Sequence, residues 1–284
     1  MKHMYLGLLL TIVWAGTGCD AARTHGGIRL EGSGKTIERT FAAGAFDKLD
    51  AEFGAEMTIV AGSGAVRVEA DDNIMEFVEI ETVDGTLRIG LAVPDKRIRS
   101  ISDVTLKVEV PSDGRLEKIT ASGSSKVTAE PVLTASEIEF RASGASRITA
   151  KVACDACEIK ATGASGAFID GTAGRCEAEA SGASKLSLAM QCTDCAIECS
   201  GASEADLAGT VRSCTVKASG ASAIRGEHFA AAQCRATANG ASSVRIQCTE
   251  KLQAQASGAS RIVYSGTCTE TETQATGASS VSRK

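Results

Sequence analysis

Aromatic residues are scarce in this chain. Only 4% of its residues are Phe, Trp or Tyr, although 43% are hydrophobic. A wide globular core usually depends on the large buried area of aromatic side chains. The scarcity therefore argues against such a core and favours a narrow interior filled by small residues such as Ala, Ser and Cys.

Histidine is also scarce, and basic residues are outnumbered by acidic ones. The three histidines, His3, His25 and His228, have no metal ligand or nucleophile at a matching spacing. No Gly-x-Ser-x-Gly elbow lies between a strand and a helix. The net charge of −5 gives no basic footprint for nucleic acid. We therefore expect no catalytic residue, no cofactor and no nucleic-acid partner.

The N-terminus has an apolar run that is too short to span a bilayer. Ten residues, Leu6 to Ala15, follow the positive Lys2, and small residues then precede Cys19. This pattern resembles a bacterial lipoprotein signal, with residues 1–18 as signal peptide, Cys19 as the lipidated residue and 19–27 as a tether. The alternative is an ordinary secretory signal in which Cys19 is incidental. Either way the sequence predicts export, and the first predicts a lipid anchor in the bacterial cell envelope, at the outer membrane or the periplasmic face.

A four-residue unit, Ser-Gly-Ala-Ser or a close variant, occurs nine times in the second half of the chain. Successive copies are 18 to 21 residues apart, and self-similarity at such a period is typical of a solenoid. The central glycines are Gly123, Gly144, Gly163, Gly182, Gly201, Gly220, Gly240, Gly258 and Gly277.

Between these units, apolar and polar residues alternate strictly. Positions two, four and six before the glycine and four and six after it are apolar, while odd positions carry most of the charge. This period of two predicts strands with one buried face. A unit of about 19 residues is too short for a propeller blade, and the Leu/Asn signature of leucine-rich repeats is absent. We therefore expect an all-β fold over 112–284, a right-handed parallel β-helix of about nine coils and on the order of 40 Å in length.

The glycine of each unit is expected at a bend that excludes a Cβ, and the variable loops at the opposite side of the coil, for example between Glu130 and Ser136. The Ser two positions after each glycine should point inward by parity. We interpret these hydroxyls as partners for backbone groups in the corner. The alternative is a functional array that binds ice or glycan, which would have to be outward and flat.

Ten cysteines follow Cys19, and five of them share one inward column. The first interpretation is that this column is part of the apolar core, since a free Cys behaves as a small hydrophobe. Disulfides 154–157, 192–195 and 248–268 are the alternative for the cysteines on the loop side. Two C-x-x-C pairs also suggest zinc, but they lie two coils apart, so no metal site is expected. The residues of these three pairs are Cys154, Cys157, Cys192, Cys195, Cys248 and Cys268.

Residues 28–111 lack the repeat unit but alternate well, for example over 104–110, and carry a hairpin signal at Asp84-Gly85. A solenoid needs its end covered, because an exposed edge invites aggregation. We expect this segment to be an N-terminal β cap.

Four segments together resemble a known family: Gly44-Ala-Phe-Asp-Lys-Leu-Asp50, Val66-Arg-Val-Glu-Ala-Asp-Asp-Asn73, Asp84-Gly-Thr-Leu87 and Gly123-Ser-Ser. They are similar to the GIN domain, described as the head domain of auto-transporter adhesins and common in exported bacterial proteins. The resemblance covers residues of about 37 to 284. It implies a β-helical fold and export, and no established activity.

The sequence thus favours a non-enzymatic lipoprotein that acts as an adhesin-like binding or structural β-solenoid. Its partners would be the membrane, through the lipid, and a glycan or surface protein. The alternative is a polysaccharide-active enzyme with a site on the loop edge, where four carboxylates are expected. These are Asp155, Asp170, Asp194 and Asp206.

Overall fold

The computed structural model describes residues 28–92 and 98–284, and in these it is almost entirely strand. The expected signal peptide, the Cys19 lipidation site and the tether lie outside the described residues. No helix in the described part of the chain has the length and hydropathy needed to cross a bilayer.

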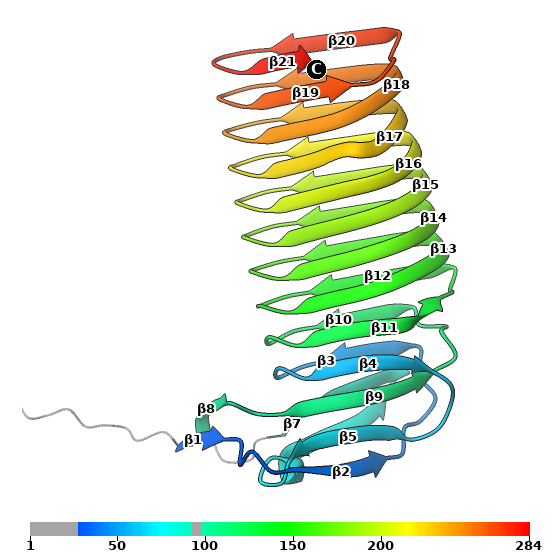
Figure 1. Cartoon of the computed structure of the whole chain (residues 1–284), viewed down its shortest axis with the longest axis vertical. Coiled ribbons are helices and arrows are strands. Elements are labelled where there is room, and N and C mark those ends of the chain that lie inside the picture. Colours follow the sequence, from blue (N-terminus) through cyan, green and yellow to red (C-terminus); the bar gives the residue numbers. More distant parts are fainter. Residues whose placement is uncertain (1–27, 93–97) are drawn as a thin grey trace, which may run out of the picture.

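The repeat region forms a β-solenoid, as the alternation predicts (Figure 1). Each turn of the coil is one long strand that runs along one broad face, bends, and returns along the other. The six long strands are β13 (Arg147–Ala161), β14 (Gly166–Ala180), β15 (Lys185–Cys199), β16 (Glu204–Ala218), β17 (Ala223–Ala238) and β18 (Ser243–Ala256). As the chain climbs, the near strands run to the right and the far strands to the left, so the coil is right-handed (Figure 1).

Neighbouring turns are parallel and in register. Arg147 lies beside Gly166, and Ala161 beside Ala180, which is the 19-residue period of the sequence. Turns at the two ends are divided into shorter strands. These are β10 (Lys118–Ala121), β11 (Lys126–Leu133) and β12 (Glu137–Ala142) below, and β19 (Arg261–Ser265), β20 (Glu270–Ala275) and β21 (Ser280–Arg283) above.

The N-terminal segment closes the lower end and also extends the stack. Strands β3 (Lys48–Ala51) and β4 (Glu56–Ala61) pair in parallel with β10 and β11, and with β7 (Thr86–Leu91) and β9 (Leu106–Ser112) below them. Antiparallel pairing of β2 (Thr36–Phe41) with β5 (Val66–Asp71), of β5 with β9 and of β6 (Val78–Val83) with β7 then covers the end. The remaining elements are β1 (Ile28–Glu31), a 3₁₀ turn (Met75–Phe77) and β8 (Ile98–Ser102). The expected boundary at 111/112 therefore falls within a continuous stack.

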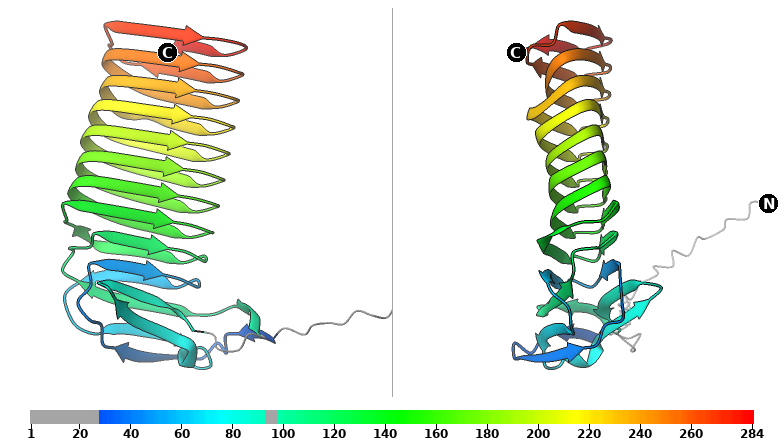
Figure 2. Two further views of the ribbon diagram at one scale, coloured as in Figure 1. Left: turned by 180° about the vertical axis from the view of Figure 1, so that it is seen from behind. Right: turned by 90° about the vertical axis from the view of Figure 1, so that its right-hand side faces the viewer.

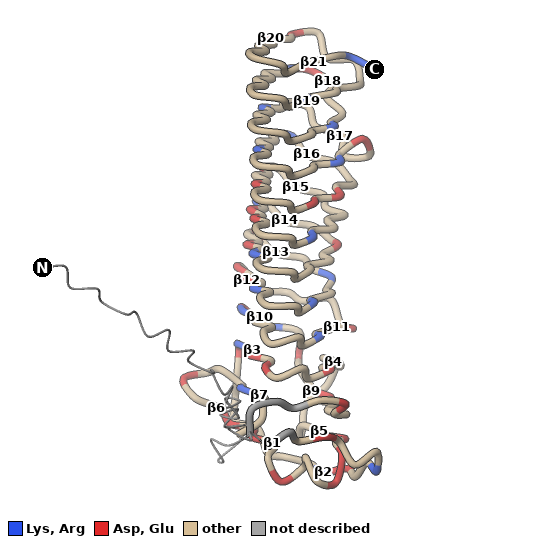
Figure 3. The backbone as a smooth tube through the Cα atoms, turned by 90° about the vertical axis from the view of Figure 1, so that its left-hand side faces the viewer, with Lys and Arg blue, Asp and Glu red and all other residues tan. Residues whose placement is uncertain are grey.

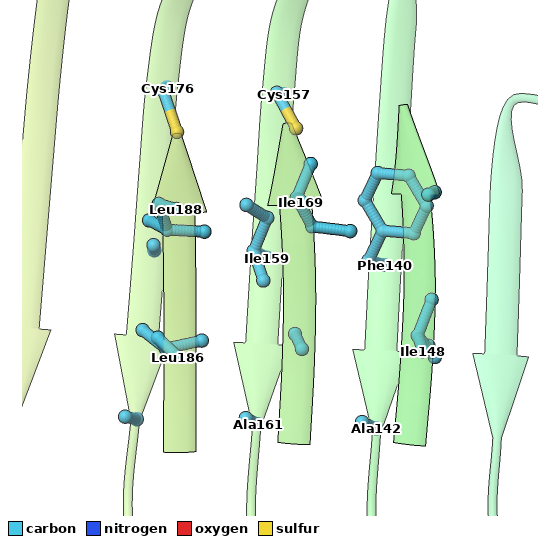
Figure 4. Packing of buried hydrophobic residues seen from close by; sticks show 14 of the residues in the cluster. Phe140, Ala142, Ile148, Cys157, Ile159, Ala161, Ile169, Cys176, Leu186 and Leu188 are labelled. Carbon is cyan, nitrogen blue, oxygen red and sulfur yellow. The ribbon is translucent and has the colours of Figure 1, made fainter. Parts of the chain in front are cut away.

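The rod is flat, broader in one view than in the view at right angles to it (Figure 2). Its interior is one layer of side chains from each face, and Phe140, Ile148, Ile159 and Leu186 are among the buried residues that meet there (Figure 4). Small residues such as Ala161 complete the layer where the faces converge (Figure 4). This geometry explains why the chain needs few aromatic residues.

The Gly-Ser corner joins the end of one turn to the start of the next. Gly182 has a φ of +75°, and a Cβ on it would lie 2.7 Å from the carbonyl oxygen of Gly163 in the turn below. The Ser184 hydroxyl is buried, 2.9 Å from the Ala161 carbonyl oxygen and 2.8 Å from that of Ser181. The serines therefore point inward and serve the corner backbone, and an outward hydroxyl array is not what they form.

The opposite corner holds the irregularities of the stack. Register shifts occur there, between Thr128 and Val132 and again between Gly226 and Ala230, which is the side where variable loops were expected. A second set of glycines, outside the Ser-Gly-Ala-Ser unit, also lies at this corner. Gly171 has a φ of +137°, and a Cβ on it would lie 1.9 Å from the Val152 carbonyl oxygen.

Candidate functional site

The outward residues of the two broad faces carry most of the charge of the solenoid. Figure 3 shows the Gly-Ser corners toward the viewer, free of charged residues along the nine repeats, with acidic and basic residues along both edges. The left edge in this view is the face built from β3, β10, β12 and the second halves of the long strands, here called the return face.

A groove of about 840 Å³ lies on the return face where the cap meets the solenoid. Its walls come from β3 and β7 of the N-terminal segment and from β10, β12, β13 and β14 above them. The basic residues in its lining are Lys48, Arg88, Lys118, Arg141 and Arg175. The acidic residues are Asp50, Glu117, Glu137, Glu139, Glu158 and Glu177.

Ion pairs within and between turns order these side chains. Lys118 Nζ lies 2.8 Å from a carboxylate oxygen of Glu139, which also accepts a hydrogen bond from Arg141. Burial of Glu139 opposes its ionisation, but the hydrogen bonds from the two cations outweigh burial and lower its pKa. The middle of this row of charged side chains is thus paired, with Lys118 and Arg141 both bound to Glu139.

Asp50 is the exception in this row. Its Oδ1 atom is buried and has no hydrogen-bond partner in the described structure. Burial is the main cause that raises the pKa of Asp50, and the nearby carboxylate of Glu52 adds to it. Arg88 and Lys118 act in the opposite direction. An unpaired buried acceptor is costly, so the lack of a partner for this oxygen adds to the cost of ionising Asp50.

The groove offers donors and acceptors and no aromatic platform. None of the residues that line it is Phe, Trp or Tyr. A ligand there would be held by hydrogen bonds and ion pairs, which suits a polar, multiply hydroxylated or charged molecule.

The cysteines are buried or half-buried, and all ten in the described residues are free thiols. The disulfides 154–157, 192–195 and 248–268 are therefore not formed in this structure. Five cysteines stack in register, from Cys157 beside Cys176 to Cys214 beside Cys234. Their burial among Ile and Leu side chains fits the interpretation of the column as core (Figure 4).

The loop-edge carboxylates do not come together. Asp206 lies on a strand, 3.0 Å from Lys185 and 3.2 Å from Arg225. Asp155 lies at the variable corner and lines a separate hollow. Within the described ranges, no cluster of three or more His, Cys, Asp or Glu side chains is arranged to hold a metal ion.

Sequence reasoning missed the groove because its lower wall comes from a degenerate repeat. The segment Leu49 to Met57 occupies the position of a turn below β10 and β11, with Phe53 at the corner in place of glycine. The apolar parity of Leu49, Ala51, Met57 and Ile59 is the signal that could have placed it in the stack.

Comparison with solved structures gives the same fold. A protein described as a "putative adhesin" from Parabacteroides merdae matches with a TM-score of 0.68 and 17% identity, covering 90% of this chain and 99% of that one. A "putative lipid binding protein" from Parabacteroides distasonis matches with a TM-score of 0.65 and 16% identity, covering 90% and 100%. At these identities the likeness concerns the fold alone. Comparison with curated proteins gives no match.

The family comparison is more specific. The model of the family described as "Putative auto-transporter adhesin, head GIN domain" matches residues 45–189 and 175–268. The two matches together cover most of the solenoid and the part of the cap that extends it. The chain belongs to the GIN domain family.

Proposed function

We propose that this chain is a non-enzymatic, adhesin-like binding module of the bacterial cell envelope, anchored by a lipid on Cys19. The observation that carries the proposal is the groove on the return face, lined by charged side chains of both signs and by the Lys118–Glu139 ion pair. The family description and the adhesin named among the similar structures support a role in binding. Its ligand would be a polar glycan or a hydrophilic surface of another protein.

Binding should be tested with a glycan array, followed by titration of any hit in solution. Arg88→Ala and Lys118→Ala each remove one charged donor from the groove. A charged hydrogen bond contributes about 1.5–3 kcal/mol, so each variant should weaken binding by roughly tenfold or more. Arg245→Ala is the matched control, because Arg245 pairs with Glu227 away from the groove at 3.5 Å. Equal losses in all three variants would place the ligand elsewhere, and a glycan array without any hit would favour a protein ligand or a scaffold.

The lipid anchor has its own test. Metabolic labelling with a fatty-acid analogue should mark the full-length protein in bacterial cells and should fail for Cys19→Ala. The variant should also leave the membrane fraction. Retention of the label in Cys19→Ala would contradict the anchor and leave the groove proposal untouched.

One observation favours a second candidate, a polysaccharide-active enzyme. Asp50 and Glu139 line the same groove, and their environments move their pKa values in opposite directions. Such a divergence of pKa values is the pattern in which one carboxyl group serves as a general acid while another stays ionised. Incubation with a panel of polysaccharides should release no reducing ends above background if the protein only binds. Release that disappears in Asp50→Asn would establish the enzyme instead.

A further inference from the structure

The bend at the variable corner determines which way the side chain of Cys157 points. Along β13 the alternation brings Val152 inward, and Cys154 follows with the same parity. Pairing with β14 then skips Asp155, between Cys154 beside Ala173 and Ala156 beside Arg175. The strand bends at this unpaired residue and its inward parity changes there, so Cys157 also faces the interior.

The two thiols interact and differ in exposure. Cys157 is 2% exposed, while Cys154 is only half-buried. A hydrogen bond with Cys157 is the main cause that lowers the pKa of Cys154, and the same bond raises the pKa of Cys157. The outer thiol is thus the better nucleophile at neutral pH, and the inner one stays protonated behind it.

Cys154 also has room in front of it. It lines a shallow hollow of about 600 Å³ at the variable corner, together with Thr134, Ser136, Asp155 and Thr172. These side chains are small or polar. A small disulfide-containing molecule could therefore reach the sulfur of Cys154 without displacing the core.

We propose that Cys154 and Cys157 form a thiol–disulfide exchange site, in which Cys154 attacks a small-molecule disulfide from the hollow and Cys157 resolves the product. The Cys154 thiolate bonds to one sulfur of the disulfide R–S–S–R, whose S–S bond breaks and releases R–S⁻. Cys157 then loses its proton to this leaving thiolate or to water and bonds to the Cys154 sulfur. The second R–S⁻ leaves and is protonated. The dithiol is oxidised by two electrons, and the small disulfide is reduced to two thiols.

A matched pair of cysteines is present two turns further along the rod. Cys192 and Cys195 have the same spacing at the same corner, with Cys192 half-buried and Cys195 buried. They serve as the internal control. Cys176 lies in register beside Cys157, so it competes with Cys154 for disulfide formation with Cys157.

The test uses the full exported chain, reduced and then exposed to glutathione disulfide at neutral pH, with quenched samples mapped by mass spectrometry. Cys154 should react first, about threefold or more faster than Cys192, because Cys154 lines the hollow through which a small disulfide can approach its sulfur. Cys157→Ala should trap glutathione on Cys154, and the unsubstituted chain should proceed to a Cys154–Cys157 disulfide with no glutathione attached. Ala is chosen because small residues already fill this interior.

Three results would overturn the proposal. They are first reaction at another cysteine, no trapped adduct in a folded Cys157→Ala variant, or a final disulfide between Cys157 and Cys176. Cys154→Ala is a second variant that should not disturb the core, because Cys154 is only half-buried. It should abolish the fast reaction with glutathione disulfide and leave the slower reactions of the other cysteines unchanged. Circular dichroism of each variant checks the fold.

Discussion

At the scale of single residues, the corner glycines combine two separate constraints. Gly201 has a φ of +73°, and a Cβ on it would lie 2.8 Å from the Gly182 carbonyl oxygen. Gly34 has nearly the same φ, +74°, but no atom within 4 Å of its would-be Cβ. A comparison of these two positions therefore separates the cost of a positive φ from the cost of a Cβ packed against the neighbouring turn.

Gly34→Ala should cost about 1–2 kcal/mol, the penalty for a Cβ in the left-handed region. Gly201→Ala should cost clearly more, because its Cβ would also push adjacent turns apart. Denaturant unfolding of both variants measures the difference. Equal losses of unfolding free energy would mean that neighbouring turns move apart without cost and that the positive φ alone requires glycine at this position.

Asp50 leads to a prediction about pH. Its pKa is raised in the folded protein, so ionisation destabilises the fold at neutral pH. This loss shrinks as the pH falls through the folded pKa and is gone below the unfolded pKa. Asp50→Asn should therefore raise Tm at pH 7 and have little effect at about pH 3, below the ordinary pKa of an aspartate. Thermal unfolding across this range checks it. A lower Tm at pH 7 would show that Arg88 and Lys118 stabilise the charged form more than burial opposes it.

At the scale of elements, the two ends of the rod differ. The lower end is covered by antiparallel strands, whereas β20 and β21 pair only with the turn below them among the described residues. Thr271 and Thr273 stand in register above Leu252 and Ala254 and are exposed. Polar residues in the inward columns thus make the upper end a poor surface for stacking.

Replacing them should remove this protection. Thr271→Leu combined with Thr273→Val should cause self-association that increases with concentration, measured by sedimentation. Gln274→Leu is the control, because Gln274 lies on the same strand beside the outward Gln255. Association of the control to the same degree would point to general stickiness rather than to the inward column.

The sequence could predict most elements, since parity and period depend on the chain alone. It could not predict β3 and β4 as part of the stack, because Phe53 replaces the glycine and adopts a φ of +58° that only the assembled corner supports. The groove needed this assembly, as Asp50 and Arg88 are far from Glu139 in sequence. The second set of corner glycines gives no periodic signal in the sequence, because such a glycine occurs in only some turns.

At the scale of the whole molecule, the repeat behaves as a stack in which each turn contacts its neighbours. Removing residues 187–205 joins Leu186 to Asp206, which takes the register position of Ser187. This variant should fold with a rod shorter by about 4.8 Å. Small-angle scattering and thermal unfolding test it.

A deletion one residue shorter provides the control. Removing 187–204 keeps Ala205 after Leu186 and turns Asp206 inward, because a shift of one residue exchanges the two faces of a strand. This variant should lose several kcal/mol or fail to fold. If both deletion variants have the same stability, the alternation of inward and outward residues does not determine how the turns stack.

The in-register ladders also determine how the rod responds to force. Hydrogen bonds between turns run along the long axis, from β13 beside β14 to β17 beside β18. If the chain is held at its N-terminal end and pulled at the last turn, the force acts on the hydrogen bonds of one turn at a time. The last turn separates first, and the turns below it follow in order. Each released turn would lengthen from about 4.8 Å to roughly 60 Å of extended chain. The molecule would therefore yield in small steps under tension, extending while the rest of the rod stays folded.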